Sequence, residues 1–446
     1  MKKIYIIGSA LCLLAACKPN LKTNTPTKGS ADFSRYVAVG NSLTAGYADN
    51  SLYRTGQENS YPERLSEQFK MVGGGSFKQP LMPGESGYPS PKLVLALTTS
   101  CTGVRSLSPI PYPGPVFDTA GSLTNISISG PYNNVGVPGI RVADYLLPGY
   151  AFVAYALGGA PYAYRFYSSP TTERPLDEAL KINATFFTCW LGSNDVLGYA
   201  TSGGSGAVAP PGFPLPNDIT AAPLFQNNYE TVIDSLTAHG AKGALINIPD
   251  VTTIPFFTTI PPNGLTLRKG QADSLNAAYG GAGGVKFAAG ANNFVIQDTT
   301  SPFGFRQIKN DELILLTVPQ DSLTCGGWGS IKPIPASFVL DETEINNVKT
   351  YTTQFNQIIA TAATKHNLAL VDMNSFLGTL QSGISFDGIR FNAKFVTGGV
   401  FSLDGVHLTP RGYAIVANHI LDAINSKYGA SVPMANVSQY NGVIFP

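Results

Sequence analysis

Few residues in this chain could support acyl-transfer chemistry, because it contains only four histidines. His407 lies three residues after Asp404 in the segment "SLDGVHLTPRGY", just before a predicted helix. This spacing allows one rigid turn to hold both side chains, so that the aspartate could orient the imidazole as a general base. The alternative is a loop that leads into a helix and contains an incidental histidine. The other histidines lie at the ends or in the interior of predicted helices, where surface or packing roles are expected: His239, His366 and His419.

A serine that could act as a nucleophile occurs in "YVAVGNSLTAGY", residues 36–47. An apolar run that predicts a buried strand leads through Gly40 to Ser42, where a helix could begin. Ser42 therefore either caps a helix or is a nucleophile at the edge of a sheet. A serine nucleophile needs a base for its hydroxyl and hydrogen-bond donors for the oxyanion that forms on the substrate.

Two further segments could supply those donors. Gly139 in "NVGVPGIR" could point its N–H at an acyl oxygen, and Asn194 in "WLGSNDVLGY" could offer its side-chain amide, with Asp195 bracing the loop. Taken alone, Gly139 also fits an ordinary turn. Asn194 and Asp195 also fit the capping pair that is common after strands.

The elements that would position these residues alternate between strands and helices. Five segments are strand candidates: 35–40, 132–137, 184–192, 243–249 and 368–373. All but the second are apolar runs, which are typical of central parallel strands covered on both faces. Helical patterns lie between them, so the sequence predicts a doubly wound α/β sheet. Sites in such sheets lie at the carboxyl ends of the strands, so we expect Ser42, Gly139 and Asn194 to meet at one edge.

The last predicted helix, in "TPRGYAIVANHILDAINSKYG", shows clear boundary signals. Thr409 is a candidate N-cap and Pro410 suits the first helical position. An apolar stripe with i, i+4 spacing would face the core: Val416, Ile420 and Ile424.

Long stretches between the elements are expected to be ordered insertions that shape a substrate cleft. They lie near residues 50–130, 145–180, 200–222 and 255–340. The tyrosines between residues 145 and 167 could line an acyl groove, stack on sugar rings or pack a surface subdomain.

The order of the chemical segments along the chain is more specific than any one of them. "GNSLTAGY", "NVGVPG", "GSND" and "DGVH" resemble, in that order, the four sequence blocks of the SGNH hydrolases, also called the GDSL lipase/esterase family. The similarity runs from about residue 35 to the end of the chain and resembles a branch of large, secreted, lipidated bacterial members. It implies a three-layer α/β/α, flavodoxin-like fold with a mostly parallel five-stranded sheet and long loop insertions. One departure is Asn41, which replaces the aspartate usual before the nucleophile and can keep its hydrogen bonds but not its charge.

The resemblance also implies the activity of a serine ester hydrolase. Ser42 would be the nucleophile, His407 its base and Asp404 the group that orients the base. The N–H groups of Ser42 and Gly139 and the side chain of Asn194 would form the oxyanion hole. The substrate would be a small-molecule, lipid or glycan ester, a range that includes the substrates of a carbohydrate O-deacetylase. The alternative from another class is a non-catalytic, glycan-binding surface lipoprotein on the same scaffold.

Composition excludes some other classes of function. The formal net charge is +1, so the chain lacks the electrostatic footprint of a nucleic-acid-binding protein. No spacing of histidines and cysteines suggests a metal site, and we expect neither a metal nor a cofactor.

The amino terminus, "MKKIYIIGSALCLLAAC", predicts a lipoprotein signal peptide. Two lysines precede an apolar run that is too short to span a bilayer stably. The run ends in "LAAC", which resembles the lipobox of bacterial lipoproteins, so Cys17 would carry lipid. Lys18, in place of an aspartate, favours the outer membrane by resemblance to the sorting rule of such lipoproteins. The alternative is an ordinary signal peptide with a chance cysteine.

The expected organisation has three parts. Residues 1–16 would be the signal peptide, 17–32 a lipidated polar tether, and 33–446 one hydrolase domain with the insertions given above. The protein would be anchored in the bacterial cell envelope and face either the periplasm or the cell surface.

The remaining cysteines of the mature chain are expected to differ in role. Cys189 lies in an apolar strand and is expected to be a buried thiol. Cys101 and Cys325 lie in loops of an exported protein, where disulfides persist, and we predict that they pair.

Lipidation at Cys17 is the prediction that follows from the "LAAC" segment. Palmitate supplied to expressing bacteria should label the wild-type protein and not the Cys17→Ala variant, because only the cysteine sulfur accepts the diacylglyceryl group. Equal labelling of the two proteins would refute the lipid anchor.

Overall fold

A parallel β-sheet forms the centre of the protein. The computed structural model describes residues 25–114, 122–156, 162–386 and 388–446. Four strands form this sheet in the order β1-β4-β5-β12: β1 (Tyr36–Gly40), β4 (Phe186–Trp190), β5 (Lys242–Ile246) and β12 (Ala369–Val371). All three pairings are parallel, and every residue of β1 and β4 is buried. Their continuous apolar sequences are therefore explained by coverage of both faces of the sheet.

The fifth expected strand, residues 132–137, differs from the prediction. It runs beside β1 and makes one isolated parallel bridge, between Asn134 and Ala38, instead of a regular strand. Three backbone hydrogen bonds of 2.8–3.0 Å join the two segments, including one from Val137 N to Gly40 O. The side chains of two consecutive asparagines also bond to backbone carbonyls, and such local bonds compete with a regular ladder.

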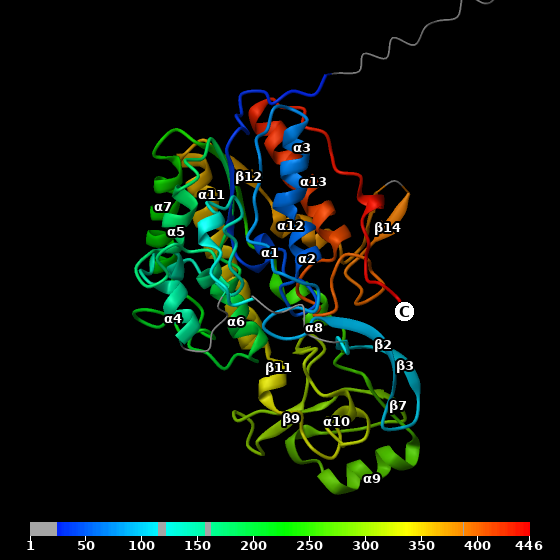
Figure 1. The fold of residues 1–446 in the computed structure, drawn as a ribbon. Coiled ribbons are helices and arrows are strands. Elements are labelled where there is room, and N and C mark those ends of the chain that lie inside the picture. Colours follow the sequence, from blue (N-terminus) through cyan, green and yellow to red (C-terminus); the bar gives the residue numbers. More distant parts are fainter. Residues whose placement is uncertain (1–24, 115–121, 157–161, 387) are drawn as a thin grey trace, which may run out of the picture.

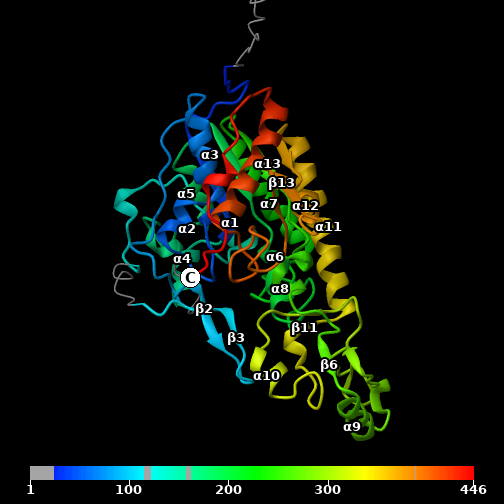
Figure 2. The same ribbon diagram turned by 90° about the vertical axis from the view of Figure 1, so that its right-hand side faces the viewer.

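Helices pack on both sides of the sheet (Figures 1 and 2). The helices α3 (Tyr61–Lys70) and α13 (Pro410–Tyr428) lie together on one side, and α7 (Ala222–Thr237) and α11 (Glu342–Lys365) lie on the other. The other helices are α1 (Ser42–Ala45), α2 (Arg54–Glu58), α4 (Tyr150–Ala156), α5 (Pro175–Leu180), α6 (Asn194–Thr201), α8 (Pro255–Thr258), α9 (Lys269–Tyr279), α10 (Gln320–Thr324) and α12 (Met373–Thr379).

The boundary prediction for α13 is confirmed. Thr409 is the N-cap, its hydroxyl accepts a hydrogen bond from Gly412 N at 3.1 Å, and Pro410 is the first helical residue. The predicted apolar stripe is completely buried: Val416, Ile420 and Ile424. This helix therefore anchors the segment that precedes it, which contains Asp404 and His407.

The first long insertion contains more regular structure than the sequence indicated. Residues 50–130 include α2, α3 and an antiparallel hairpin of β2 (Leu93–Thr99) and β3 (Arg105–Pro111). Leu65 and Phe69 of α3 are buried one helical turn apart, a signal that the Gly- and Pro-rich composition of the stretch obscured.

Residues 255–340 form an insertion lobe that projects from the sheet-containing body, with the β2–β3 hairpin reaching alongside it (Figures 1 and 2). The lobe has short strands: β6 (Leu265–Leu267), β7 (Gly290–Asn292), β8 (Val295–Gln297), β9 (Phe305–Gln307), β10 (Leu313–Ile314) and β11 (Val339–Leu340). Two small hydrophobic clusters stabilise it, one around Phe294 and Ile314 and one around Leu275 and Phe287. A last hairpin, β13 (Ile384–Phe386) with β14 (Ile389–Phe391), lies before α13.

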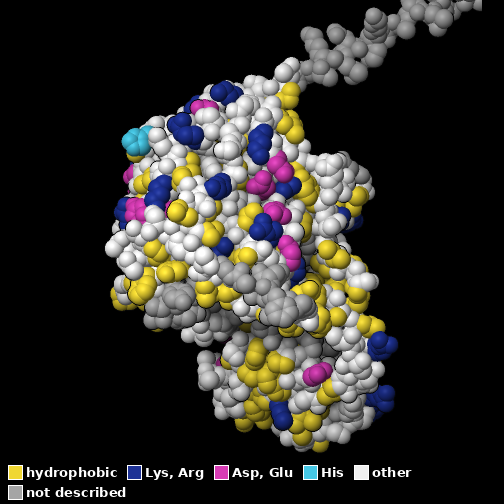
Figure 3. Space-filling model, viewed as in Figure 1, with side chains coloured by type: hydrophobic (Ala, Val, Ile, Leu, Met, Phe, Trp, Pro, Cys, Tyr) yellow, Lys and Arg dark blue, Asp and Glu magenta, His cyan; other side chains and the backbone are white. Residues whose placement is uncertain are grey.

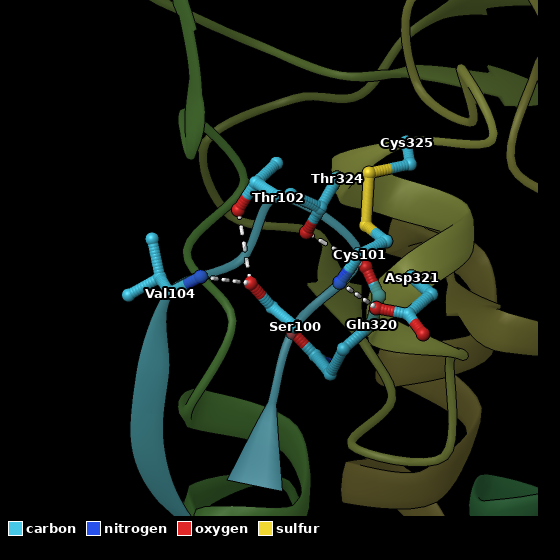
Figure 4. Close-up of a disulfide and its surroundings, with 8 residues drawn as sticks. All are labelled: Ser100, Cys101, Thr102, Val104, Gln320, Asp321, Thr324 and Cys325. Carbon is cyan, nitrogen blue, oxygen red and sulfur yellow. Dashed lines mark hydrogen bonds between the residues drawn. A yellow bond between two sulfur atoms is a disulfide. The ribbon is translucent and has the colours of Figure 1, made fainter.

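A disulfide connects the hairpin with the lobe (Figure 4). Cys101, in the turn between β2 and β3, is bonded to Cys325, which follows α10. Cys101 N also donates to Asp321 Oδ1 at 3.4 Å. This is the pair that the sequence predicts, and Cys189 is a buried free thiol in β4 as expected.

The segment before β1 is docked over more of its length than expected. The predicted tether extended to residue 32, but Thr27 N donates to Ser431 Oγ at 3.0 Å and Ala31 is buried. The docked chain begins earlier because its backbone groups find partners beside the end of α13. Cys17 and the expected signal peptide lie outside the described residues. None of the helices in the described ranges combines the length and hydropathy needed to cross a membrane.

Candidate active site

Ser42 lies at the carboxyl end of β1 and is the first residue of α1. The N-cap of this short helix is Asn41, whose Oδ1 accepts a hydrogen bond from Leu43 N at 3.1 Å. The turn is tight, since a Cβ on Gly40 would lie 2.0 Å from Thr44 Oγ1. Asn41 therefore performs the capping that the sequence left open for Ser42, and the serine hydroxyl is available for another partner.

That partner is His407. Its Nε2 lies 2.8 Å from Ser42 Oγ, and its Nδ1 lies 2.9 Å from Asp404 Oδ2. The three side chains thus form one continuous hydrogen-bonded series although the serine is 365 residues from the histidine. The geometry is that of a serine activated by a base, which a third group orients.

The Asp404 carboxylate accepts four hydrogen bonds besides the one from the side-chain Nδ1 of His407. Three come from the backbone N–H groups of Asn50, Val406 and His407, at 2.8–2.9 Å, and one comes from Ser402 Oγ at 3.0 Å. Burial alone would raise the pKa of Asp404, but His407 and these N–H groups hold it well below the usual carboxyl range. Asp404 is therefore ionised and favours the tautomer of His407 that carries its proton on Nδ1.

The contribution of residues 49–50 was not foreseen from the sequence. Both residues have left-handed backbone conformations, with φ of 52° at Asp49 and 61° at Asn50. This turn lets Asn50 N donate to Asp404, while Asp49 Oδ1 accepts from Leu403 N at 3.0 Å and Asp49 N donates to Ser402 Oγ at 3.0 Å. The available signal was the Asp-Asn pair itself, because these residue types tolerate positive φ better than most.

Tyr47 was also missed, and it forms a wall beside the imidazole. Its ring centroid lies 4.6 Å from that of His407, and its backbone oxygen accepts a hydrogen bond from Tyr413 Oη at 2.7 Å. Burial and the charge of Asp404 raise the pKa of Tyr47 above its usual value, so the ring stays neutral. Tyr47 thus restricts the imidazole without adding charge.

Gly139 and Asn194 lie at the same edge of the sheet as Ser42. Gly40, at the end of β1, pairs with Trp190, at the end of β4, and Gly40 O accepts a hydrogen bond from Val137 N. The segments that follow Gly40, Val137 and Trp190 therefore meet at this edge. Gly139 is exposed, has φ of 81°, and a Cβ there would contact nothing within 4 Å. Asn194 Nδ2 donates to Ile140 O at 2.9 Å, and a primary amide carries a second N–H for a further acceptor.

Asp195 is a buried brace between two loops. Its carboxylate accepts hydrogen bonds from Thr220 Oγ1 at 2.7 Å and from Val142 N at 3.1 Å. It therefore joins the start of α6 to the segment that contains Gly139, as the bracing interpretation expected. Burial raises the pKa of Asp195 to about 7.

The other three histidines and the tyrosines between residues 145 and 167 lie outside the Ser42–His407–Asp404 series. His239 is exposed, His366 Nδ1 lies 3.1 Å from Thr237 Oγ1, and the His419 ring stacks on Phe376. Three roles were open for the tyrosines between residues 145 and 167: lining an acyl groove, stacking on sugar rings or packing a subdomain. Those whose side chains are described pack in or against the main hydrophobic core. Those buried in the main core are Tyr145, Tyr162 and Tyr167.

Fold and site together define an α/β protein with a Ser-His-Asp series at the carboxyl edge of a parallel sheet. Residues 36–420 match the family of GDSL-like lipases and acylhydrolases. This match covers most of the chain, so the protein belongs to that family, and membership supports ester hydrolysis as its general activity. No curated protein matches the chain.

The buried position of Asp195 predicts a specific pH dependence of stability. The pKa is about 7 in the folded protein against 3.8 for an unperturbed aspartate, so the folded state binds the proton more tightly. The stabilisation that the protonated Asp195 carboxyl contributes is therefore lost as the pH rises from 3.8 to about 7, and it does not return at higher pH. An asparagine side chain cannot ionise, so the Asp195→Asn variant should gain melting temperature relative to wild type between pH 5 and pH 8. A difference in melting temperature that does not change over this range would contradict the raised pKa.

Proposed function

We propose that the protein is a serine ester hydrolase that cleaves carboxylic esters through an acyl-enzyme on Ser42. The observation that carries the proposal is the continuous series from Ser42 Oγ through His407 to the ionised Asp404, in a member of the GDSL-like lipase and acylhydrolase family. Each of the three groups already has the hydrogen bond that its proposed role requires.

The proposed reaction has two halves. Ser42 Oγ attacks the ester carbonyl carbon while His407 Nε2 takes the hydroxyl proton, and the carbonyl electron pair moves to oxygen. Collapse of this intermediate breaks the bond to the alcohol, which leaves with the proton from His407. Water then attacks the acyl-enzyme through the same base, and Ser42 is regenerated as the acid departs. The charge of Asp404 stabilises the imidazolium in both halves.

The proposed oxyanion hole consists of the N–H groups of Ser42 and Gly139 and the second amide N–H of Asn194. Supporting it are the shared sheet edge, the open space beside Gly139 and the hydrogen bond that fixes Asn194 to Ile140 O. Donors held in place before the reaction stabilise the oxyanion without reorganising as charge develops.

Two wider assignments belong to the same proposal. We infer a three-layer α/β/α core in which residues 132–137 act as the fifth strand, supported by their backbone hydrogen bonds to β1. We also propose attachment to the bacterial cell envelope, at the outer membrane, through lipid on Cys17. The support for this anchor is the signal sequence ending in "LAAC".

Kinetics of single variants test the proposed roles. On a short-chain nitrophenyl ester, Ser42→Ala and His407→Ala should each lose nearly all turnover, and the double variant should be hardly worse, because the two residues act as one unit. Asn194→Ala should lose about 10²–10³ in turnover with little change in KM, since it removes one donor to the developing charge.

The matched control is His239→Ala, which removes an exposed histidine outside the site and should keep wild-type turnover. Melting temperatures establish that each variant is folded. Near-normal turnover of a folded Ser42→Ala variant would remove the mechanism, whereas a folded wild type without turnover would favour the glycan-binding lipoprotein.

A further inference from the structure

A groove of about 990 Å³ lies between the hairpin, the insertion lobe and the turn that contains Asp404. Leu107 and Pro109 of β3 line the hairpin side, Ile260 and Leu265 belong to the lobe side, and Leu403 belongs to the body. The space-filling view shows hydrophobic side chains gathered on the lobe, below the body (Figure 3). The groove is thus formed largely by the segments that are inserted into the α/β core.

The chemistry of the lining favours a hydrocarbon ligand. Asp404 is the only charged residue among those that line the groove in the described part of the chain. Most of the others are aliphatic or phenylalanine side chains, and the polar minority is mainly threonine. A sugar would lose hydrogen bonds to water without finding enough partners here, whereas an alkyl chain gains from leaving water.

The inner end of the groove adjoins the proposed active site. Asn50 and Asp404 both line it, and Asn50 N donates to the Asp404 carboxylate. The lobe packs directly on this turn, since Phe256 N donates to Gly405 O at 2.9 Å. The His407 ring connects Asp404 to Ser42 Oγ through one hydrogen bond at each of its two nitrogens. Ser42 does not itself line the groove, so only an ester whose acyl chain extends past the His407 ring could reach it.

The disulfide holds two walls of the groove together. Gln320, Leu323 and Thr324 of α10 line the groove immediately before Cys325, and the bonded Cys101 lies at the turn of the hairpin that supplies the facing wall. Figure 4 shows the bond spanning from the hairpin to this helix. A covalent link at this position limits how far the hairpin can move from the lobe.

We propose that this groove binds the long acyl chain of an ester whose carbonyl lies at Ser42, and that the Cys101–Cys325 disulfide maintains its width. The inference rests on the proposed ester hydrolase function and gives it a substrate class, namely esters of long-chain fatty acids. The inserted hairpin and lobe, rather than the α/β core, set this preference.

Acyl-chain profiles of matched leucine variants test the proposal. Leu107 and Leu97 are cross-strand partners in the hairpin and are 42% and 52% exposed, but only Leu107 lines the groove. Wild type should prefer nitrophenyl dodecanoate to the butyrate in kcat/KM. Leu107→Lys should reduce this preference about tenfold, the equivalent of losing contact with about two methylene groups. Leu97→Lys should leave both substrates unchanged.

The disulfide is tested by the Cys101→Ser/Cys325→Ser double variant. It should keep butyrate turnover and lose part of the dodecanoate preference, with melting temperature recorded to establish that it is folded. A wild type that hydrolyses butyrate without chain-length preference, or equal effects of the two leucine variants, would overturn the groove while the hydrolase stands. A wild type that hydrolyses neither ester would overturn the hydrolase function and the groove together.

Discussion

The contact between Asp404 and His407 is the constraint on which the rest of the site depends. A buried carboxylate is costly unless hydrogen bonds replace its hydration, and four donors besides His407 Nδ1 meet this requirement. One of those donors, Asn50 N, comes from a part of the chain that is 354 residues away. The ionised aspartate therefore fixes the orientation of His407 and holds the chain after β1 against the chain before α13.

The same turn connects the α/β core with the inserted segments. Phe256 N donates to Gly405 O, and a Cβ on Gly405 would lie 2.9 Å from a side-chain atom of Leu316 and 3.0 Å from Phe256 N. The lobe thus packs on the residues that position the imidazole. The Cys101–Cys325 disulfide links the lobe to the β2–β3 hairpin. One structural unit can in this way hold the proposed base and shape the proposed acyl site.

The sequence predicted the parts of this arrangement that depend on local patterns. The limits of α13 followed from Thr409, Pro410 and the apolar stripe. The pairing of Ser42 with His407 is not local, and it followed from the resemblance of four sequence blocks to a known family. The Asp-Asn pair could have indicated the left-handed turn at residues 49–50, but not its contact with Asp404, which lies far along the chain. The groove also could not be predicted, because its walls meet only through tertiary packing. At residues 132–137 the side chains of two asparagines bond to backbone carbonyls, and the segment makes one isolated bridge instead of a regular strand.

Reaction with a fluorophosphonate, followed by peptide mass mapping, tests the central claim most directly. This reagent phosphonylates a serine that a neighbouring base activates, without requiring knowledge of the natural ester. The account predicts a single adduct on Ser42 in the wild-type protein and strongly slowed formation of that adduct in the folded His407→Ala variant. The absence of an adduct in folded wild type, or an adduct on a different serine such as Ser193, would contradict it.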